Sequence, residues 1–407
     1  MTDRISLYLF DDRPARRWAP MTLTRPAGEL LHGCLTLRAR SEHVLDTSCL
    51  GHLSRSDLEG FDEPGAAPVV ARSQVSSEGT RVFLCSRAVL DFGAVEVPAE
   101  RRRILVDGTP VGWIVPHGDD PPEDAWLRAP DGAPEEYGRP VEWPGTVLGQ
   151  LWDLVAANPR RIAADVAHLW PDDGAPEGVV RLGDGTISLG HRAEIEPAVH
   201  VDVRDGPVRL ADGARVEGPG RITGPLFVGP DSIVFGGSVG TSSIGPVCRV
   251  RGEVAESVLL GYVNKAHDGH LGHAYLGRWV NLGAFTTNSD LKNNYRTVRV
   301  WTLDGEQDTG LIKVGCFLGD HVKTGIGTIL NTGTLIGAGS NVFGGLMPPT
   351  VVPPFSWGTG SDLRDHRLEK FLETAERVME RRGQSLTPGV TEILRTAWKE
   401  TAGRRAQ

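Results

Sequence analysis

An aliphatic residue recurs at every sixth position over two long stretches in the second half of this chain. The first series is Leu210, Val216, Ile222, Val228 and Val234; the second is Ile312, Leu318, Leu330, Ile336 and Val342, interrupted at Thr324. Neither an α-helix nor an ordinary β-strand has this period, whereas a parallel β-helix with three short strands per coil does. The sequence therefore predicts a β-helix whose aliphatic residues point inward and whose Gly, Asp and Asn residues form the corners.

The same periodicity sets the expected domain organisation. The β-helix is expected over 187–348. The six-residue period is lost between 285 and 310, which predicts a loop that leaves the coil. Residues 1–178 are expected to form an α/β domain, because this part of the chain contains both short strand candidates and segments with helical spacing. A helical segment is expected over 362–402. The strand candidates are Ile5–Phe10, Arg81–Cys85, Arg103–Val106 and Gly112–Val115, and the helix candidates are Leu148–Asn158, Pro159–Leu169, Asp362–Arg382 and Val390–Thr401.

Composition excludes several classes of function. The 407 residues include 43 Lys and Arg against 52 Asp and Glu, a net charge of −9, without a basic run. This balance argues against nucleic acid or an anionic membrane as partner. The five cysteines are odd in number and show no CxxC spacing, as expected of reduced thiols in the cytoplasm. No apolar segment is long enough to span a bilayer, so we expect a soluble cytoplasmic protein.

The densest group of polar side chains lies between residues 261 and 296. Histidine can remove a proton near neutral pH, Lys and Arg suit an anionic substrate, and Asn can stabilise an oxyanion. The pattern thus indicates chemistry on an anionic substrate. The residues that form it are Lys265, His267, His270, His273, Asn281, Asn288, Asp290, Lys292, Asn293, Asn294, Tyr295 and Arg296.

Three runs in this region resemble a known family. They are Gly-Pro-Val-Cys-Arg-Val at 245–250, Asn-Lys-Ala-His-Asp-Gly-His at 264–270 and Asn-Leu-Gly-Ala at 281–284. They are similar to the GlmU-like family, relatives of the bifunctional N-acetylglucosamine-1-phosphate uridyltransferase/glucosamine-1-phosphate acetyltransferase. The resemblance implies a Rossmann-like nucleotidyltransferase domain followed by a left-handed β-helix. It also implies a homotrimer with acetyl-CoA, as cosubstrate, lying between neighbouring coils.

The resemblance also implies roles for particular residues. The acetyltransferase motif of the family has a catalytic His and an Asn fourteen residues later, a spacing that His267 and Asn281 keep. His267 would then deprotonate the amine of an amino-sugar phosphate, and Asn281 would hold the oxyanion. The family's Tyr is replaced by His270, and Arg296 stands where a Lys contacts the sugar phosphate. The implied substrate-binding residues are Lys265, His270, Asn288, Lys292, Asn293, Tyr295 and Arg296.

Small residues at the later corners suggest a place for the cosubstrate. Gly325, Thr332 and Gly337 would let an extended pantetheine arm lie close to the coil, although ordinary tight corners would explain them equally well.

The first domain departs from the family at its phosphate-binding loop. The family has a Gly-rich loop after the first strand, whereas residues 11–18 read Asp-Asp-Arg-Pro-Ala-Arg-Arg-Trp. Thr24-Arg25-Pro26 stands near the position of a family Pro-Lys pair, and Ser86 and Arg87 follow a middle strand where a metal-binding Asp is expected. Candidate nucleotide-binding residues are Arg13, Arg16, Arg17 and Arg25, with Mg²⁺ as cofactor if this domain is active. A solvated arginine face is the other interpretation.

Two further functions are compatible with the sequence. The β-helix could serve only as a trimerisation scaffold for a nucleotidyltransferase or a sugar-nucleotide-binding protein. Alternatively, His267, His270 and His273 could bind zinc, as in carbonic anhydrases of this fold. Residues three and six apart on a β-coil do not all point the same way, which disfavours the zinc site. The favoured prediction is a transferase acting on a sugar phosphate with acyl-CoA, and with an NTP if the first domain is active.

Overall fold

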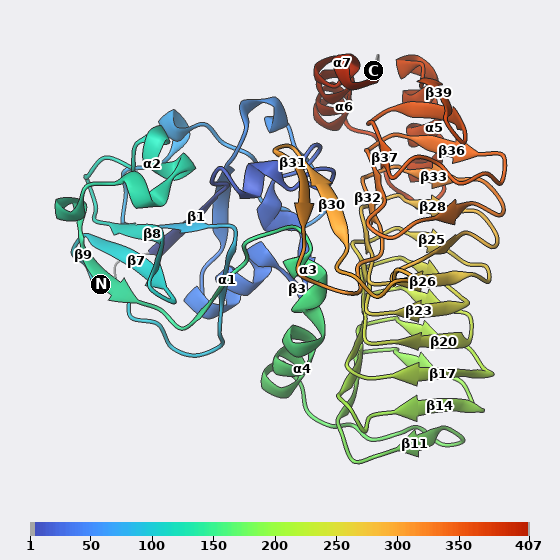
Figure 1. Ribbon diagram of the computed structural model, residues 1–407. Coiled ribbons are helices and arrows are strands. Elements are labelled where there is room, and N and C mark those ends of the chain that lie inside the picture. The colour runs from blue at the N-terminus through green and yellow to red at the C-terminus, as the bar shows by residue number, and fades with distance from the viewer. Residues whose placement is uncertain (1–4, 406–407) are drawn as a thin grey trace.

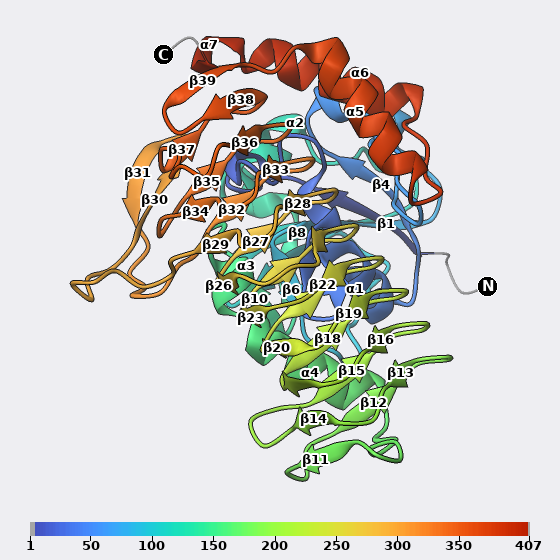
Figure 2. The same cartoon turned by 90° about the vertical axis from the view of Figure 1, so that its right-hand side faces the viewer.

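The computed structural model describes residues 5–405, which form an α/β domain lying against the side of a long parallel β-helix (Figure 1). Helices at the C-terminal end of the chain cross one end of the β-helix (Figure 2). None of the described helices is long and apolar enough to cross a membrane.

The N-terminal domain is built on a six-stranded mixed sheet in the order β4-β1-β5-β8-β7-β9. The strands are β1 (Ile5–Phe10), β4 (Cys49–Leu53), β5 (Thr80–Cys85), β7 (Arg102–Val106), β8 (Thr109–Val115) and β9 (Arg139–Glu142). Strand β1 runs parallel to both β4 and β5, which brings the carboxyl ends of these three strands to one edge. Central strands of this kind are buried on both faces and therefore have continuous apolar runs. The four strand candidates of this domain are confirmed: β1 has the predicted bounds, and β5, β7 and β8 begin one to three residues earlier than predicted.

Smaller elements surround this sheet. The short strands are β2 (Leu31–His32), β3 (Leu35–Thr36), β6 (Ala88–Leu90) and β10 (Gly145–Val147), and the helices are α1 (Leu37–Leu45), α2 (Asp124–Arg128), α3 (Asp153–Ala156) and α4 (Asn158–Leu169). The helix expected over Pro159–Leu169 is confirmed as α4, whereas Leu148–Asn158 contains only the four-residue α3.

The β-helix has three faces, each formed by strands from successive coils that pair in parallel, apart from β39 at the end of one face. The six-stranded face contains β11 (Val180–Leu182), β14 (Val199–Asp202), β17 (Gly220–Thr223), β20 (Gly237–Gly240), β23 (Glu253–Ala255) and β26 (His270–Gly272). The nine-stranded face contains β12 (Ile187–Leu189), β15 (Val208–Leu210), β18 (Leu226–Val228), β21 (Ser243–Ile244), β24 (Val258–Leu259), β27 (Tyr275–Leu276), β32 (Phe317–Leu318), β35 (Leu335–Ile336) and β37 (Val351–Val352). The ten-stranded face contains β13 (Glu194–Ile195), β16 (Arg215–Val216), β19 (Ile233–Val234), β22 (Arg249–Val250), β25 (Asn264–Lys265), β28 (Asn281–Leu282), β33 (Lys323–Thr324), β36 (Asn341–Phe343), β38 (Ser356–Thr359) and β39 (Asp362–Asp365).

The six-residue series forms the core of the coil. All five aliphatic residues of the first series are buried there, as are Leu318, Leu330, Ile336 and Val342 of the second. Thr324, the interruption, is buried too. Ile312 contradicts the prediction, since it is 53% exposed. It lies in the segment that returns from the projecting loop to β32, so its position in the series is coincidental.

The predicted loop is present after coil strand β28. It contains β29 (Thr287–Asn288), which pairs with β34 (Ile329–Leu330), and a hairpin of β30 (Arg299–Thr302) and β31 (Gly305–Asp308). The hairpin reaches across to the N-terminal domain (Figure 1), where Val298 and Val300 join an apolar cluster with residues of both domains.

The C-terminal helices are α5 (Leu368–Glu380), α6 (Pro388–Glu400) and α7 (Ala402–Arg405). The expected helix over Asp362–Arg382 is wrong at its start, because residues 362–365 form β39, antiparallel to β38. Pairing with an existing sheet edge outweighs helix propensity there. Phe371 and Leu372 of α5 pack on Phe355 at the end of the coil.

Candidate functional sites

The three clustered histidines have different environments. His267 is exposed at the corner between β25 and β26, and its imidazole has no hydrogen-bond partner among residues 5–405. His270, on β26, lies 3.4 Å from a carboxylate oxygen of Glu253 and 3.8 Å from one of Asp290. His273 lies one corner further and is held by two carboxylates. Of the three, His267 therefore remains available to take a proton from a substrate.

Asp290 is the centre of the His270 and His273 environment. Its Oδ2 lies 2.8 Å from Nδ1 of His273, whose Nε2 lies 2.9 Å from Glu256. Burial lowers the pKa of His273, but the bonds to Asp290 and Glu256 outweigh it and raise the pKa to about 9. Asp290 also raises the pKa of His270, and the two histidines hold the pKa of Asp290 far below its usual value. This ion cluster ties the start of the projecting loop to the coil.

Two candidate substrate-binding residues are used inside the coil. The Nζ of Lys265 donates to the backbone carbonyls of Arg251, at 2.8 Å, and of His267, and burial lowers its pKa to about 8. The side-chain amide of Asn288 accepts from the Gly272 N–H and donates to the Gly272 carbonyl, both at 2.9 Å. Both side chains satisfy backbone groups at corners that would otherwise be buried without partners.

The position of Asn281 follows from the length of the coil. Asn264 is paired in register with Asn281, seventeen residues later, so a fourteen-residue spacing does not place Asn281 directly above His267. Instead, Nδ2 of Asn264 donates to Oδ1 of Asn281 at 2.8 Å on the outer side of the ten-stranded face. No hydrogen bond joins His267 to Asn281 within the described chain.

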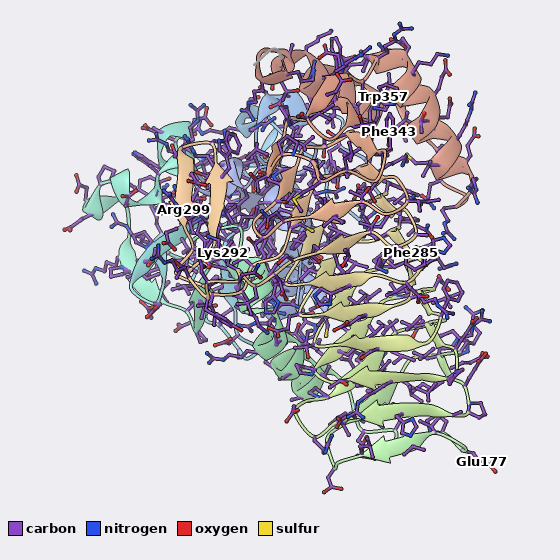
Figure 3. All side chains as sticks on the ribbon, turned by 45° about the vertical axis from the view of Figure 1, so that its right-hand side comes forward. Glu177, Phe285, Lys292, Arg299, Phe343 and Trp357 are labelled. Carbon is purple, nitrogen blue, oxygen red and sulfur yellow. The ribbon has the colours of Figure 1, made fainter. Side chains whose placement is uncertain are left out.

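The remaining candidates of the loop lie at another edge of the β-helix. Lys292 donates to the Thr297 carbonyl at 2.9 Å, while Asn293, Tyr295 and Arg296 are exposed. The corner that contains His267 adjoins Phe285, because the Phe285 N–H donates to the Asp268 carbonyl. Figure 3 shows Lys292 on the opposite side of the coil from Phe285. In a single chain, His267 and the cations of the loop therefore do not share one site.

The three candidate cofactor-binding residues are also separated. Gly325 follows β33 of the ten-stranded face, whereas Gly337 follows β35 of the nine-stranded face. Thr332 is buried between them along the chain. They do not line a single groove in one chain.

A second polar site lies at the edge where β1, β4 and β5 end. Asp11, directly after β1, accepts hydrogen bonds from the hydroxyls of Ser54 and Ser86 and from the Ala27 N–H. Asp12 pairs with Arg87. Ser54 was missed by the sequence analysis, although a polar residue directly after an apolar strand is a recognisable signal of such an edge.

This edge does not fit a magnesium site. Both carboxylates are buried, and each already accepts several hydrogen bonds from the protein. Among residues 5–405, no three His, Cys, Asp or Glu side chains are grouped so that they could hold a metal ion. The residues at this edge therefore do not support a step that depends on a metal ion held by them.

The four candidate nucleotide-binding arginines differ in their partners. Arg25 is buried between Glu63 and Asp320, and Arg17 pairs with Asp304 of the hairpin. Arg13 is exposed. Arg16 donates to the backbone carbonyls of Asp11, at 2.7 Å, and Ser54, at 3.2 Å, without a carboxylate partner among the described residues.

Arg16 also faces a cavity. It lines a space of about 440 Å³ beside the carboxyl end of β4, together with Arg55, Arg72 and Arg128. Ligands of open α/β sheets bind outside the carboxyl ends of the strands, where this cavity lies.

Similar proteins are known for parts of this chain. Residues 7–172 match the family of sugar nucleotidyl transferases. A bifunctional sugar-1-phosphate nucleotidylyltransferase/acetyltransferase of Sulfurisphaera tokodaii is 26% identical over 198 residues, 49% of this chain and 44% of that protein. The bifunctional protein GlmU of Acaryochloris marina is 28% identical over 184 residues, 40% of this chain and 35% of the relative. The matches thus span less than half the length of these relatives.

Among solved structures, a UDP-N-acetylglucosamine acyltransferase of Arabidopsis aligns with 57% of this chain and 98% of its own, at 11% identity and a TM-score of 0.27. The similarity of this chain to known families rests on the sequence matches and not on this structural alignment. Residues 7–172 are thus similar to sugar nucleotidyl transferases, a parallel β-helix follows them, and the chain is distantly similar to the GlmU proteins.

Proposed function

We propose that the β-helix transfers an acyl group from acyl-CoA to the amine of an amino-sugar phosphate, with His267 as general base. The observation that carries this proposal is the free, exposed imidazole of His267 beside two histidines that are both paired with carboxylates. The imidazole takes the proton of the amine while the amine nitrogen attacks the thioester carbonyl. A C–N bond forms, the C–S bond breaks, and the imidazolium returns the proton to sulfur, so that CoA leaves as the thiol.

The proposed site is completed by a second copy of the chain in a homotrimer. The corner that contains His267 adjoins Phe285, and Lys292 lies on the opposite side of the coil from Phe285 (Figure 3). In this proposal a second copy of the chain brings Lys292 and Arg296 to His267. Exposed apolar residues on the later coils support an interface between copies. They are Phe285, Ile326, Ile329, Leu346, Met347 and Trp357.

The test is a mass-spectrometric assay of acyl transfer from acetyl-CoA to a panel of amino-sugar 1-phosphates. We expect His267→Ala to reduce turnover by about 100-fold or more, as for loss of a general base. His200→Ala, which removes another exposed histidine of the β-helix, should leave turnover unchanged. Unchanged turnover in His267→Ala would end the assignment.

Complementation tests the shared site separately. Inactive His267→Ala and Arg296→Ala chains, expressed together, should form mixed oligomers that regain part of the activity, since some interfaces then combine two intact residues. If both residues act within one chain, mixing restores nothing.

A second activity is favoured by the match of residues 7–172 to sugar nucleotidyl transferases. In this activity a sugar 1-phosphate oxygen attacks the α-phosphorus of an NTP, and pyrophosphate leaves. We propose that the cavity beside β4 holds the nucleotide phosphates and that Arg16 binds them, because a guanidinium without a carboxylate partner suits phosphate.

The test supplies NTP, Mg²⁺ and hexose or hexosamine 1-phosphates and measures pyrophosphate release. We expect Arg16→Lys to lower release at least tenfold, because Lys keeps the charge but loses the bidentate geometry. Arg101→Lys, at a surface pair with Asp119, is the matched control. Failure of the wild type to convert any of these sugars excludes the activity.

A further inference from the structure

A second and larger cavity lies where five parts of the chain meet. It has a volume of about 530 Å³, within the usual range for small-molecule sites. Its walls come from the segment after β1, the segment after β4, the tip of the β30–β31 hairpin, the last coils of the β-helix and α7. None of the candidate acyl-transfer residues His267, Asn281, Lys292 or Arg296 lines it. We call it the junction cavity.

The junction cavity is cationic although the chain as a whole is acidic. Its lining includes Arg16, Arg55, Arg364, Arg404 and Arg405, and no Asp or Glu. Three of these arginines have nearby carboxylates: Asp57 for Arg55, Asp362 for Arg364 and Asp365 for Arg405. An arginine-rich wall in a protein of net charge −9 indicates an anionic ligand.

Two guanidinium groups of the wall lack a carboxylate partner among residues 5–405. Arg16 donates to two backbone carbonyls, and the guanidinium carbon of Arg404 lies 5.9 Å from the ring centroid of Trp301. Arginine binds phosphate through a planar pair of N–H groups, so both side chains retain the chemistry that a phosphate needs.

The rest of the lining suits an aromatic body. The indole of Trp301 is accompanied by Leu335, Val351 and Pro353. Thr22, also in the wall, is buried, and its hydroxyl has no hydrogen-bond partner in the described part of the chain. A buried hydroxyl without a partner costs free energy unless a ligand or water satisfies it.

We propose that the junction cavity binds a nucleoside phosphate, with its phosphate on Arg16 and Arg404 and its base among Trp301 and the apolar residues. The site is separate from the proposed acyl-transfer site. The junction cavity shares Arg16 and Arg55 with the cavity beside β4. Arg404 lines the junction cavity but not the cavity beside β4. Its occupant would contact the N-terminal domain, the hairpin and the C-terminal helix at once.

Calorimetric titration of the full chain with ADP tests the proposal. We expect Arg404→Gln to weaken ADP binding at least tenfold, and Trp301→Leu to do the same. Arg377→Gln, an exposed arginine of α5 outside the cavity, should bind ADP as the wild type does. Arg404 is exposed, so its replacement leaves the fold intact and the comparison valid.

Three results would overturn the proposal. One is the absence of ADP binding to the wild type, and another is ADP binding that Arg404→Gln and Trp301→Leu both leave unchanged, which would place the nucleotide elsewhere. The third is equal affinity for ribose 5-phosphate, which would show that the cavity recognises phosphate but no base. Pyrophosphate release in the NTP assay is measured independently, so loss of one activity does not imply loss of the other.

Discussion

At the scale of single residues, neighbours of one type have unlike roles because the coil turns between them. His267 projects from a corner, whereas His270 and His273 face the carboxylates of adjacent coils and of the projecting loop. The i, i+3, i+6 spacing disfavoured convergence of all three on geometric grounds. It could not show which of them would remain free, since Asp290 and Glu256 come from other coils.

The Asp290 cluster gives a stability that depends on pH. The folded-state pKa of His273 is raised from 6.5 to about 9, so its contribution is complete below about pH 6.5 and is lost as the pH rises through 9. The pKa of Asp290 is lowered, so its contribution is present above about pH 4 and decreases in stronger acid.

We therefore expect Asp290→Asn to lower the free energy of unfolding by about 1–2 kcal/mol at pH 6, after allowance for solvent screening, and by much less at pH 10. Urea unfolding at the two pH values measures the difference. Asp184→Asn, at an exposed corner of the β-helix, is the control. An equal loss at both pH values would contradict the ion cluster as its cause.

At the scale of elements, the six-residue period of aliphatic residues is interrupted wherever the number of residues per coil changes. Register partners on the ten-stranded face are eighteen residues apart between Arg215 and Ile233 but only fifteen apart between Arg249 and Asn264. Shortened corners remove residues without moving the inward-facing side chains, so Val250 and Val263 stay buried in the core. The period therefore predicted the β-helix, but it did not predict the exact positions of the inward-facing residues in the middle coils.

The positions of the hairpin and β39, in contrast, could not be predicted from the local sequence. The loop was predicted from the missing beat, but its β30–β31 hairpin acquires a position only by packing Val298 and Val300 against the N-terminal domain. Similarly, residues 362–365 form a strand because β38 presents an edge to them. Tertiary contacts override helical spacing in a segment this short.

At the scale of the whole molecule, a buried ion network joins the two domains. Arg25 lies 2.8 Å from both Glu63 and Asp320, and Arg278 of the β-helix lies 3.1 Å from Glu63. The phenol of Tyr275 adds two hydrogen bonds to the backbone of Leu31 across the same boundary. Charges buried in this way are costly unless every partner is present.

Removing one partner should therefore loosen the whole assembly. We expect Asp320→Ala to destabilise the protein by about 3–5 kcal/mol, because it leaves the buried Arg25 with Glu63 alone. Limited proteolysis should then cut sooner within 171–178, between the domains. Asp119→Ala breaks only a partly exposed pair with Arg101 and should cost less than about 1 kcal/mol. Equal protease resistance of the two variants would contradict a structural role for the network.

Sequence alone determined the features that repeat. The β-helix, four strands of the first sheet (β1, β5, β7 and β8) and the loop after residue 285 follow from periodicity and local composition, because every coil contributes aliphatic residues to the shared core. The polar region at 261–296 also followed from sequence, since such a density of polar side chains exceeds what coil corners require.

Only the tertiary structure decided which residues from distant segments come into contact. Arg25 resembled a phosphate ligand in sequence, yet it is enclosed by Glu63 and Asp320 from distant segments. The junction cavity combines residues nearly 400 positions apart, such as Arg16 and Arg404. Pairings of this kind depend on how two domains dock, and no local pattern records that geometry.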